Sequence, residues 1–361
     1  MKLLFGADLV PTSYTEEFFV KKEIKKLFGE TIGVINSADR FIVNVECALT
    51  KSNNAIKKMG PSIKADPKCA DCLKEVGITD AVLSNNHVFD YGIEGLKETL
   101  DNLDRVGIAY TGVGENDTLS RKPYIIEQEG KKVAIINVAE HEYTYALPDR
   151  MGVNPFDPFL TMQDIRETRE NVDYLIVIYH GGKEECRYPS PRLYNLCHEM
   201  VHCGADAVLC QHSHCIGCYE EYKGAHILYG QGNFHFCKPK DADGWNSGLM
   251  VELNIEDKVE IKFYPIVSNN NGIDLARGNE KCKIIADFND RNKMLLNGEW
   301  RNGWKAFCLK VKDYYVGALK GLGTEESTDI QNQLFAHFLD CEAHTDVWRE
   351  LYPTWNLTNE K

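Results

Sequence analysis

Short apolar runs recur along the first 270 residues and alternate with segments of helical periodicity. A run such as residues 175–178, Leu-Ile-Val-Ile, predicts a strand that is buried on both faces of its sheet. Over residues 93–103, leucine and isoleucine return every three or four positions, which predicts an amphipathic helix. This alternation is typical of a layered α/β domain, in which helices cover sheets.

The apolar runs predict strands, and the segments between them predict helices. The predicted strands are Lys2–Phe5, Arg40–Val45, Ala81–Ser84, Lys132–Val138, Tyr174–Tyr179, Ala207–Cys210, His226–Tyr229, Leu249–Ile255 and Val259–Val267. Helices are predicted after Gly92 and over Phe159–Asn171 and Pro191–Cys203.

The pattern changes after residues 269–272, Asn-Asn-Asn-Gly, where longer helical segments rich in tryptophan and charge begin. We therefore predict one domain over residues 1–270 and a mostly helical C-terminal extension over residues 271–361 that packs on it. Aromatic residues of the extension are interpreted as core and docking positions for helices: Trp300, Trp304, Tyr314, Tyr315, Trp348 and Trp355.

The charge of the chain limits its partners. A formal net charge of −13 opposes binding to nucleic acids, whose phosphates are bound by clustered Lys and Arg. Only residues 3–7 are apolar between Lys2 and Asp8, fewer than the roughly 7–15 residues of a signal peptide. No run of about 18 apolar residues occurs in the sequence. We therefore expect a cytoplasmic protein without a membrane span and without a nucleic-acid partner.

Polar residues with metal-binding side chains follow five of the predicted strands. They are Asp8, Glu46, Asn86 with His87, His180, and His212 with His214. Strand ends bring such side chains to one edge of a sheet, where ligand sites form in α/β folds. Carboxylate, amide and imidazole groups are ligands that Zn, Mn and Fe accept, so we predict one or two divalent metal ions. Two ions about 3.5–4 Å apart need a bridging carboxylate, for which Glu46 is the candidate.

Six motifs then occur in order along the chain: Gly6-Ala7-Asp8, Asn44–Thr50, Leu83–Gly92, His180–Glu184, Gln211–His214 and Tyr229–Phe234. The third contains Asn-Asn-His-x-x-Asp-Tyr-Gly. Together they resemble the CapA-type capsule-biosynthesis (poly-γ-glutamate synthesis) proteins, which are similar to the calcineurin-like metallophosphoesterases. The resemblance covers roughly residues 1–270 and implies an α/β/β/α sandwich of the metallophosphoesterase type.

The resemblance also implies which residues hold two metals. The first site would take Asp8, Glu46 and His214, and the second Glu46, Asn86, His180 and His212. His87 would contact phosphate beside the metals and act as the general acid, because an imidazole titrates near the working pH. These residues imply hydrolysis by metal-activated water.

Two positions depart from the family pattern. In the wider phosphoesterase pattern a histidine ligand follows the first aspartate by two residues, but here Val10 stands there, so the first site has one donor fewer. The block His180-Gly181-Gly182 also lacks the tryptophan that is usual after this histidine, which is expected to reshape the pocket wall rather than the metal shell.

Three further residues are candidates for contacting the substrate, each with a structural alternative. Lys64 clamps an anionic substrate or is a surface lysine. Glu184 orients His180 or a bound water, or caps a loop. Asn233 reaches the site or supports a left-handed turn. Asp90 in turn bonds its own turn or supports His87.

The predicted function is a metal-dependent hydrolase, first of all a phosphoesterase, that acts on a small anionic substrate. The alternative is a non-catalytic or accessory component of capsule or poly-γ-glutamate synthesis, which uses the same fold as a scaffold for an anionic polymer. A third reading is hydrolysis of an amide or γ-glutamyl bond, because a two-metal site attacks carbonyl carbon as well as phosphorus.

Overall fold

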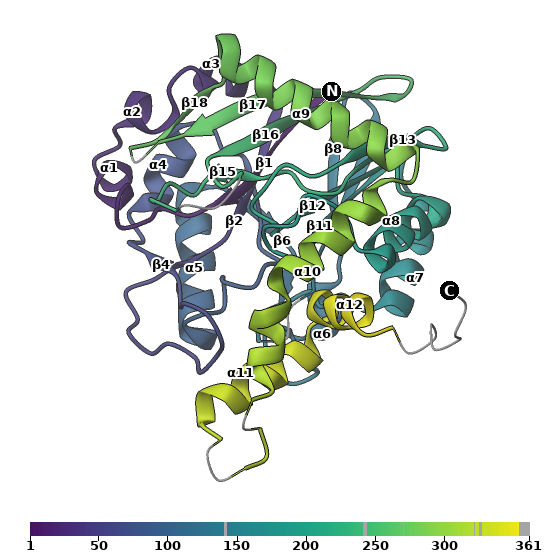
Figure 1. Ribbon diagram of the computed structural model, residues 1–361. Coiled ribbons are helices and arrows are strands. Elements are labelled where there is room, and N and C mark those ends of the chain that lie inside the picture. The colour runs from purple at the N-terminus through teal and green to yellow at the C-terminus, as the bar shows by residue number, and fades with distance from the viewer. Residues whose placement is uncertain (141–142, 241–243, 270, 321, 325–326, 354–361) are drawn as a thin grey trace.

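Two β-sheets pack face to face, and helices cover the outer face of each (Figure 1). The computed structural model describes residues 1–353 apart from 141–142, 241–243, 270, 321 and 325–326. Across the larger sheet the strands are, in order, β18 (Ile273–Leu275), β17 (Val259–Ser268), β16 (Ser247–Ile255), β1 (Lys2–Leu9), β2 (Arg40–Val45), β5 (Asp80–Val82) and β6 (Ala109–Thr111). A further strand, β15 (Asn233–His235), pairs with β1 beside this path. From β1 to β6 the strands are parallel.

The smaller sheet is parallel in its centre and antiparallel at both edges. Its order is β13 (Tyr219–Tyr222), β14 (Ala225–Leu228), β12 (Ala207–Gln211), β11 (Tyr174–His180), β9 (Lys131–Ala139) and β8 (Tyr124–Gln128). Strands β9, β11, β12 and β14 are parallel. Two short ladders join β3 (Ala48–Leu49) to β4 (Lys64–Ala65) and β7 (Val113–Gly114) to β10 (Gly152–Val153).

The helices form one layer on each sheet and a separate group at the C-terminus. The layer on the larger sheet consists of α1 (Glu16–Val20), α2 (Ile24–Phe28), α3 (Thr31–Ile35), α4 (Cys69–Glu75) and α5 (Gly92–Val106). The layer on the smaller sheet consists of α7 (Pro158–Arg169) and α8 (Pro191–Cys203), and α6 (Asp117–Ser120) contacts β7 and β10. The C-terminal helices are α9 (Gly278–Leu296), α10 (Trp300–Ala318), α11 (Asp329–Asp340) and α12 (Glu342–Leu351).

Alternation along the strands distributes the apolar side chains between the layers. In β1, Leu3 and Phe5 pack between the two sheets, whereas Leu4 packs against the helices of the larger sheet. In β11, Ile176 faces the space between the sheets and Val177 faces α7 and α8. Because neighbouring strand residues point to opposite faces, a run that is apolar throughout requires a layer on each side. The predicted α/β/β/α sandwich with C-terminal helices is therefore confirmed.

All nine predicted strands are present, with changes at their ends. Strand β1 continues to Leu9, so Asp8 lies within the strand rather than after it. Strand β5 ends at Val82 and not at Ser84 as predicted. Here Ser84 leaves the ladder because its backbone N–H donates to Asn137 Oδ1 (2.7 Å) and its hydroxyl donates to the Gly112 carbonyl (2.6 Å). The sequence around Ser84 could not predict this strand end, because it depends on hydrogen bonds to residues far away in the chain.

Helices α7 and α8 begin close to the predicted residues because each carries a strong N-terminal signal. The side chain of Asp157 accepts hydrogen bonds at the start of α7, and that of Ser190 does so at the start of α8. In both, a proline occupies the first helical position, where its missing N–H is not needed.

The C-terminal helices pack around a small apolar cluster that also includes Cys186, from the segment between β11 and α8. Trp304, Tyr315 and Phe338 are buried in it, as the aromatic pattern predicted for the first two. Tyr314 is not a core position, because the residue is 58% exposed, but its ring contacts Phe338 of α11 at 5.6 Å between ring centroids. Trp355 lies outside the described residues. None of the helices in the described ranges combines the length and the apolar composition needed to cross a membrane.

Buried His235 generates a prediction about stability and pH. It packs against Phe19 and Phe28, and burial lowers the pKa of its imidazole from 6.5 to about 4. The unfolded chain therefore binds this proton more tightly, so stability falls as pH decreases from about 6.5 to about 4. The change His235→Leu should remove about 2 kcal/mol of the loss between pH 8 and pH 5, measured by urea unfolding. An identical pH dependence in both proteins would contradict this.

Candidate functional site

Parallel strands of both sheets deliver polar side chains to one place. Asp8 lies near the end of β1, Glu46 directly follows β2, His180 ends β11, and His212 directly follows β12. The register aligns these ends, since Asp8 pairs with Asn44 in β2 and His180 pairs with Gln211 in β12. The carboxyl ends of the two sheets thus meet in a single polar cluster, as the sequence predicted for strand ends in general.

Within this cluster the ligand atoms form overlapping groups. Donor atoms of Asp8, Glu46 and His214 lie within 4.8 Å of one another, and so do those of Glu46, His180 and His212. Glu46 belongs to both groups. A third group of the same spacing joins Glu184 to His212 and His214.

Individual distances suit a shared cation. His180 Nε2 lies 2.9 Å from Asn86 Oδ1 and 3.4 Å from Glu46 Oε1. On the other side, His214 Nδ1 lies 3.2 Å from Asp8 Oδ2. Two ligand atoms bound at right angles to one ion at roughly 2.1 Å would be roughly 3.0 Å apart. The donors therefore have the separations that a coordination shell requires.

The two buried carboxylates of the cluster, Asp8 and Glu46, differ in their hydrogen-bond partners. Both oxygens of Glu46 are buried and accept no hydrogen bond from any residue in the described part of the chain. Burial, with the charges of Asp8 and Glu184, raises the pKa of Glu46 well above its usual value. Burial would also raise the pKa of Asp8, but the hydrogen bond from His214 and the charge of His180 lower it. An orphaned carboxylate among nitrogen and oxygen donors fits a bound divalent cation.

Asparagines that the sequence reasoning missed orient the donors. Asn44 donates to Asp8 Oδ1 (2.8 Å) and lies 3.2 Å from His180 Nδ1. Asn85 in turn donates to Asn44 Oδ1 (2.9 Å). Such partners fix the orientation of ligating side chains. Asn44 and Asn85 lie inside two of the six sequence motifs, and this position was the sequence feature that could have indicated their role.

Asn233 belongs to the same supporting shell. Its Oδ1 lies 2.9 Å from His214 Nδ1, and its amide donates to the Trp245 carbonyl (2.9 Å). The left-handed backbone in this segment is at Gly232 (φ 77°). The side chain of Asn233 therefore reaches the cluster, and the turn that the alternative reading gave to Asn233 is made by Gly232.

The backbone of the histidine pair is strained. His212 (φ 88°) and His214 (φ 54°) both have positive φ, which residues with a Cβ seldom adopt. The backbone N–H of His212 donates to Asp8 Oδ2 (3.2 Å) and helps to hold this conformation. Strain of this kind costs on the order of 1–3 kcal/mol per residue and gathers at functional sites.

His87 is held by a buried carboxylate. Its Nδ1 lies 2.7 Å from Asp90 Oδ2, which also accepts the backbone N–H of Ile63 (2.7 Å). Burial lowers the pKa of His87, and the hydrogen bond to Asp90 opposes that shift. Because Nδ1 is hydrogen-bonded to Asp90, Nε2 is the ring nitrogen that can interact with a ligand in the cavity that His87 lines.

Lys58 is a buried cation that the sequence did not single out. Its Nζ pairs with Asp90 Oδ1 and donates to the Asn86 carbonyl (2.9 Å), and its side chain is 4% exposed. Lys64, the predicted clamp, instead bonds Ser52 O and Asn53 Oδ1 and lies 4.9 Å from the ring centre of Tyr91. The cation beside His87 is therefore Lys58, placed there by a loop without a regular pattern.

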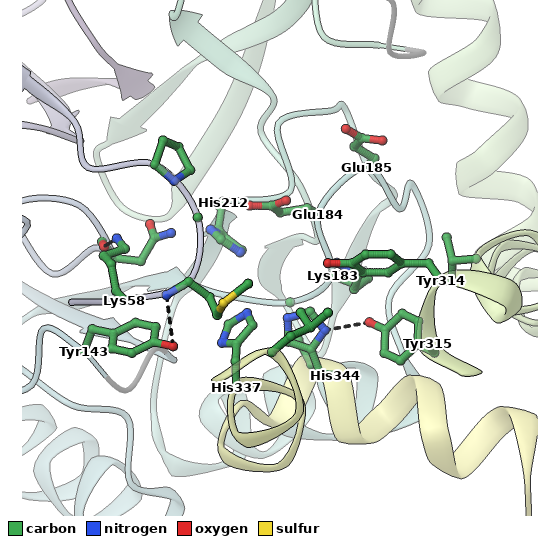
Figure 2. Close-up of a pocket in the computed structure, with 18 of the residues that line it drawn as sticks. Lys58, Tyr143, Lys183, Glu184, Glu185, His212, Tyr314, Tyr315, His337 and His344 are labelled. Carbon is green, nitrogen blue, oxygen red and sulfur yellow. Dashed lines mark hydrogen bonds between the residues drawn. The ribbon is translucent and has the colours of Figure 1, made fainter. Parts of the chain in front are cut away.

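A cavity of about 360 Å³ opens in front of the cluster (Figure 2). Asn86, His87 and His212 line its base, with Lys58, Lys183 and Glu184 beside them. Glu184 thus lies at the cavity, whereas Lys64 does not line it and Val10 is buried in the core. The opposite wall comes from α10, α11 and α12: Phe307, Val311, Tyr314, Tyr315, Leu334, His337, Ala343 and His344.

Comparisons with known proteins agree with these motifs. The family model described as "Bacterial capsule synthesis protein PGA_cap" matches residues 2–238. "PGA biosynthesis protein CapA" of Bacillus subtilis (strain 168) is 28% identical over 247 residues, which are 64% of this chain and 62% of that protein. "Capsule biosynthesis protein CapA" of Bacillus anthracis is 29% identical over 204 residues, which are 54% of this chain and 48% of that protein. The chain therefore spans about half to three-fifths of the length of these relatives.

Among solved structures, that of a 5'-nucleotidase precursor from Thermus thermophilus is similar with a TM-score of 0.44 and 11% identity. The match covers 74% of this chain and 54% of that one.

The buried Glu46 carboxylate predicts that its removal stabilises the metal-free protein. Because the pKa of Glu46 is raised in the folded metal-free protein, its contribution to stability is lost as pH rises above the ordinary value of 4.5. Glu46→Gln should therefore melt at a higher temperature than the wild type at pH 8 in EDTA, by a margin that shrinks toward pH 4. Addition of Mn²⁺ should raise the melting temperature of the wild type much more than that of the variant.

Thermal unfolding in EDTA and in MnCl₂ measures both effects. The exposed Glu221→Gln serves as the control and should leave both melting temperatures unchanged. A Glu46→Gln protein less stable than the wild type in EDTA would show that the carboxylate is satisfied without a cation.

Proposed function

The chain belongs to the PGA_cap family of bacterial capsule synthesis proteins, and from that premise we propose that it is a metal-dependent hydrolase of phosphoesters with a small anionic substrate. The observation that carries the proposal is the buried Glu46 carboxylate, which is shared by two groups of ligand atoms and accepts no hydrogen bond from a described residue. A buried carboxylate that accepts no hydrogen bond is costly to keep ionised, and a cation bound among the surrounding donors would compensate its charge.

The cluster offers candidate ligands for two divalent ions. Asp8, Glu46 and His214 would hold one ion, and Glu46, Asn86, His180 and His212 would hold the other. The mixture of oxygen and nitrogen donors suits Mn, Zn or Fe. Bound there, such ions polarise phosphoryl oxygens and lower the pKa of water. With Val10 in place of a histidine, the first site depends more heavily on Asp8 and His214.

His87 is the proposed general acid. Asp90 accepts a hydrogen bond from Nδ1–H of His87, which favours the imidazolium form, and Nε2 would then donate a proton to the departing alkoxide oxygen. Lys58 pairs with the other oxygen of Asp90, so the carboxylate is held between the imidazole and the ammonium group. A substrate phosphate in the cavity would add negative charge beside the ring and favour the protonated form further.

The names of the relatives favour a second candidate function. Both curated relatives are named for capsule or PGA biosynthesis, so the chain can instead be an accessory component that binds an anionic polymer. The net charge of −13 disfavours binding of a polyanion to the parts of the surface outside the metal cluster. Hydrolysis of a γ-glutamyl bond by the same donors is the third reading, and it shares its chemistry with the first.

The test begins with the metal content of the purified protein and a panel of phosphomonoesters, phosphodiesters and a γ-glutamyl amide, each with and without Mn²⁺. The change His87→Ala should lower kcat for the best phosphoester by about 10²–10⁴-fold without loss of metal, because it removes the proton donor and no ligand. The half-exposed His202→Ala, on α8, is the matched control and should keep full activity.

The outcomes separate the candidates. Turnover of the γ-glutamyl amide alone would favour the third reading. Metal binding without turnover of any panel member would favour the accessory role. Unchanged turnover in His87→Ala would show that another group protonates the leaving oxygen.

A further inference from the structure

The wall of the cavity that faces the metal donors comes from a part of the chain beyond the family match. That match ends at residue 238, whereas α10, α11 and α12 begin at residue 300. In Figure 2 the side chains of Tyr314, His337 and His344 extend from these helices toward the space in front of His212 and Lys58. The base of the cavity thus lies within the family match, and the opposite wall lies outside it.

The two walls differ in chemistry. The base carries Lys58, Lys183 and the metal donors, which together attract one anionic group. The helical wall combines the apolar side chains of Phe307, Val311, Leu334 and Ala343 with the rings of Tyr314, Tyr315, His337 and His344, and it carries no Lys, Arg, Asp or Glu among its described lining residues. A site with an anion-binding end and an apolar end is suited to an ester whose organic group is itself apolar.

Tyr314 is the ring on this wall with most area still open. It is 58% exposed, although Tyr315 beside it is fully buried and donates to or accepts from His344 Nδ1 (2.6 Å). An exposed aromatic ring at the lip of a cavity gains from contact with a flat ligand group. Burial of Tyr315 against Phe338, at 4.5 Å between ring centroids, anchors the segment that presents Tyr314.

The wall is fixed to the body by a buried ionic network. In α8, Arg192 Nε donates to Asp346 Oδ2 of α12 (2.9 Å) and its guanidinium also pairs with Glu140. Glu140 accepts the backbone N–H of Gly182 (2.8 Å), two residues after the ligand His180. The network therefore links α12 of the helical wall to the loop that follows His180.

We propose that the helical wall is a subsite for the organic group of the substrate, and that it selects compact phosphoesters with a flat, largely apolar group over extended polyanions. This inference rests on the proposed phosphoesterase function. A cavity of about 360 Å³ holds a small molecule. The carboxylate of Glu184 lines the same space and opposes a second negative group on the ligand.

Binding of two phosphonates tests the subsite without turnover. Calorimetry on the Mn²⁺-loaded full chain should show phenylphosphonate bound about 5- to 10-fold more tightly than methylphosphonate, because only the phenyl ring contacts the helical wall. The change Tyr314→Ala should remove most of this ratio, and Tyr314→Phe should keep it. Tyr352→Ala is the control, since Tyr352 is 50% exposed and does not line the cavity.

Each result bears on one proposal. Equal affinities for the two phosphonates in the wild type, equal ratios in the wild type and Tyr314→Ala, or no binding of either probe would overturn the subsite. A phenyl preference that Tyr314→Ala abolishes, in a protein that hydrolyses no ester, would leave the subsite standing and reject the phosphoesterase. Phosphoester turnover without a phenyl preference would support the phosphoesterase and reject the subsite.

Discussion

The burial of two carboxylates in one place, Asp8 and Glu46, is the constraint on which the rest of the site depends. Both are fully buried, and only Asp8 has hydrogen-bond donors in the described part of the chain. Two like charges in a medium of low polarity repel strongly, so the arrangement is stable only with protonation or a bound cation. The imidazoles and the amide around them are the other candidate ligands of the cation that we propose to bind here.

The fold supplies that combination by joining two parallel arrays at their carboxyl ends. Strands β1 and β2 bring the carboxylates, and β11 and β12 bring the histidines, from sheets whose apolar faces pack together. This arrangement requires conformational strain in the backbone, since His212 and His214 both have positive φ. Local strain and an uncompensated charge are both features that favour function over the stability of the metal-free protein.

The C-terminal helices add chemistry that the matched region lacks. The candidate metal ligands, His87 and Asp90 lie within the matched residues 2–238, whereas the largely aromatic and aliphatic helical wall opposite them does not. The Arg192–Asp346 pair joins the two parts, because Arg192 lies on α8 and Asp346 on α12.

The sequence by itself determined the layered fold and the residues at the strand ends, because period and apolar content are local properties that each segment carries alone. Asp8, Glu46, His180 and His212 were therefore recognisable as candidates before their distances were known. Only the tertiary structure decided that Lys58 and not Lys64 lies beside His87, that Asn44 orients Asp8, and that Tyr314 faces the cavity. These are contacts between segments far apart in the chain, and they depend on where loops and helices dock rather than on any repeating pattern.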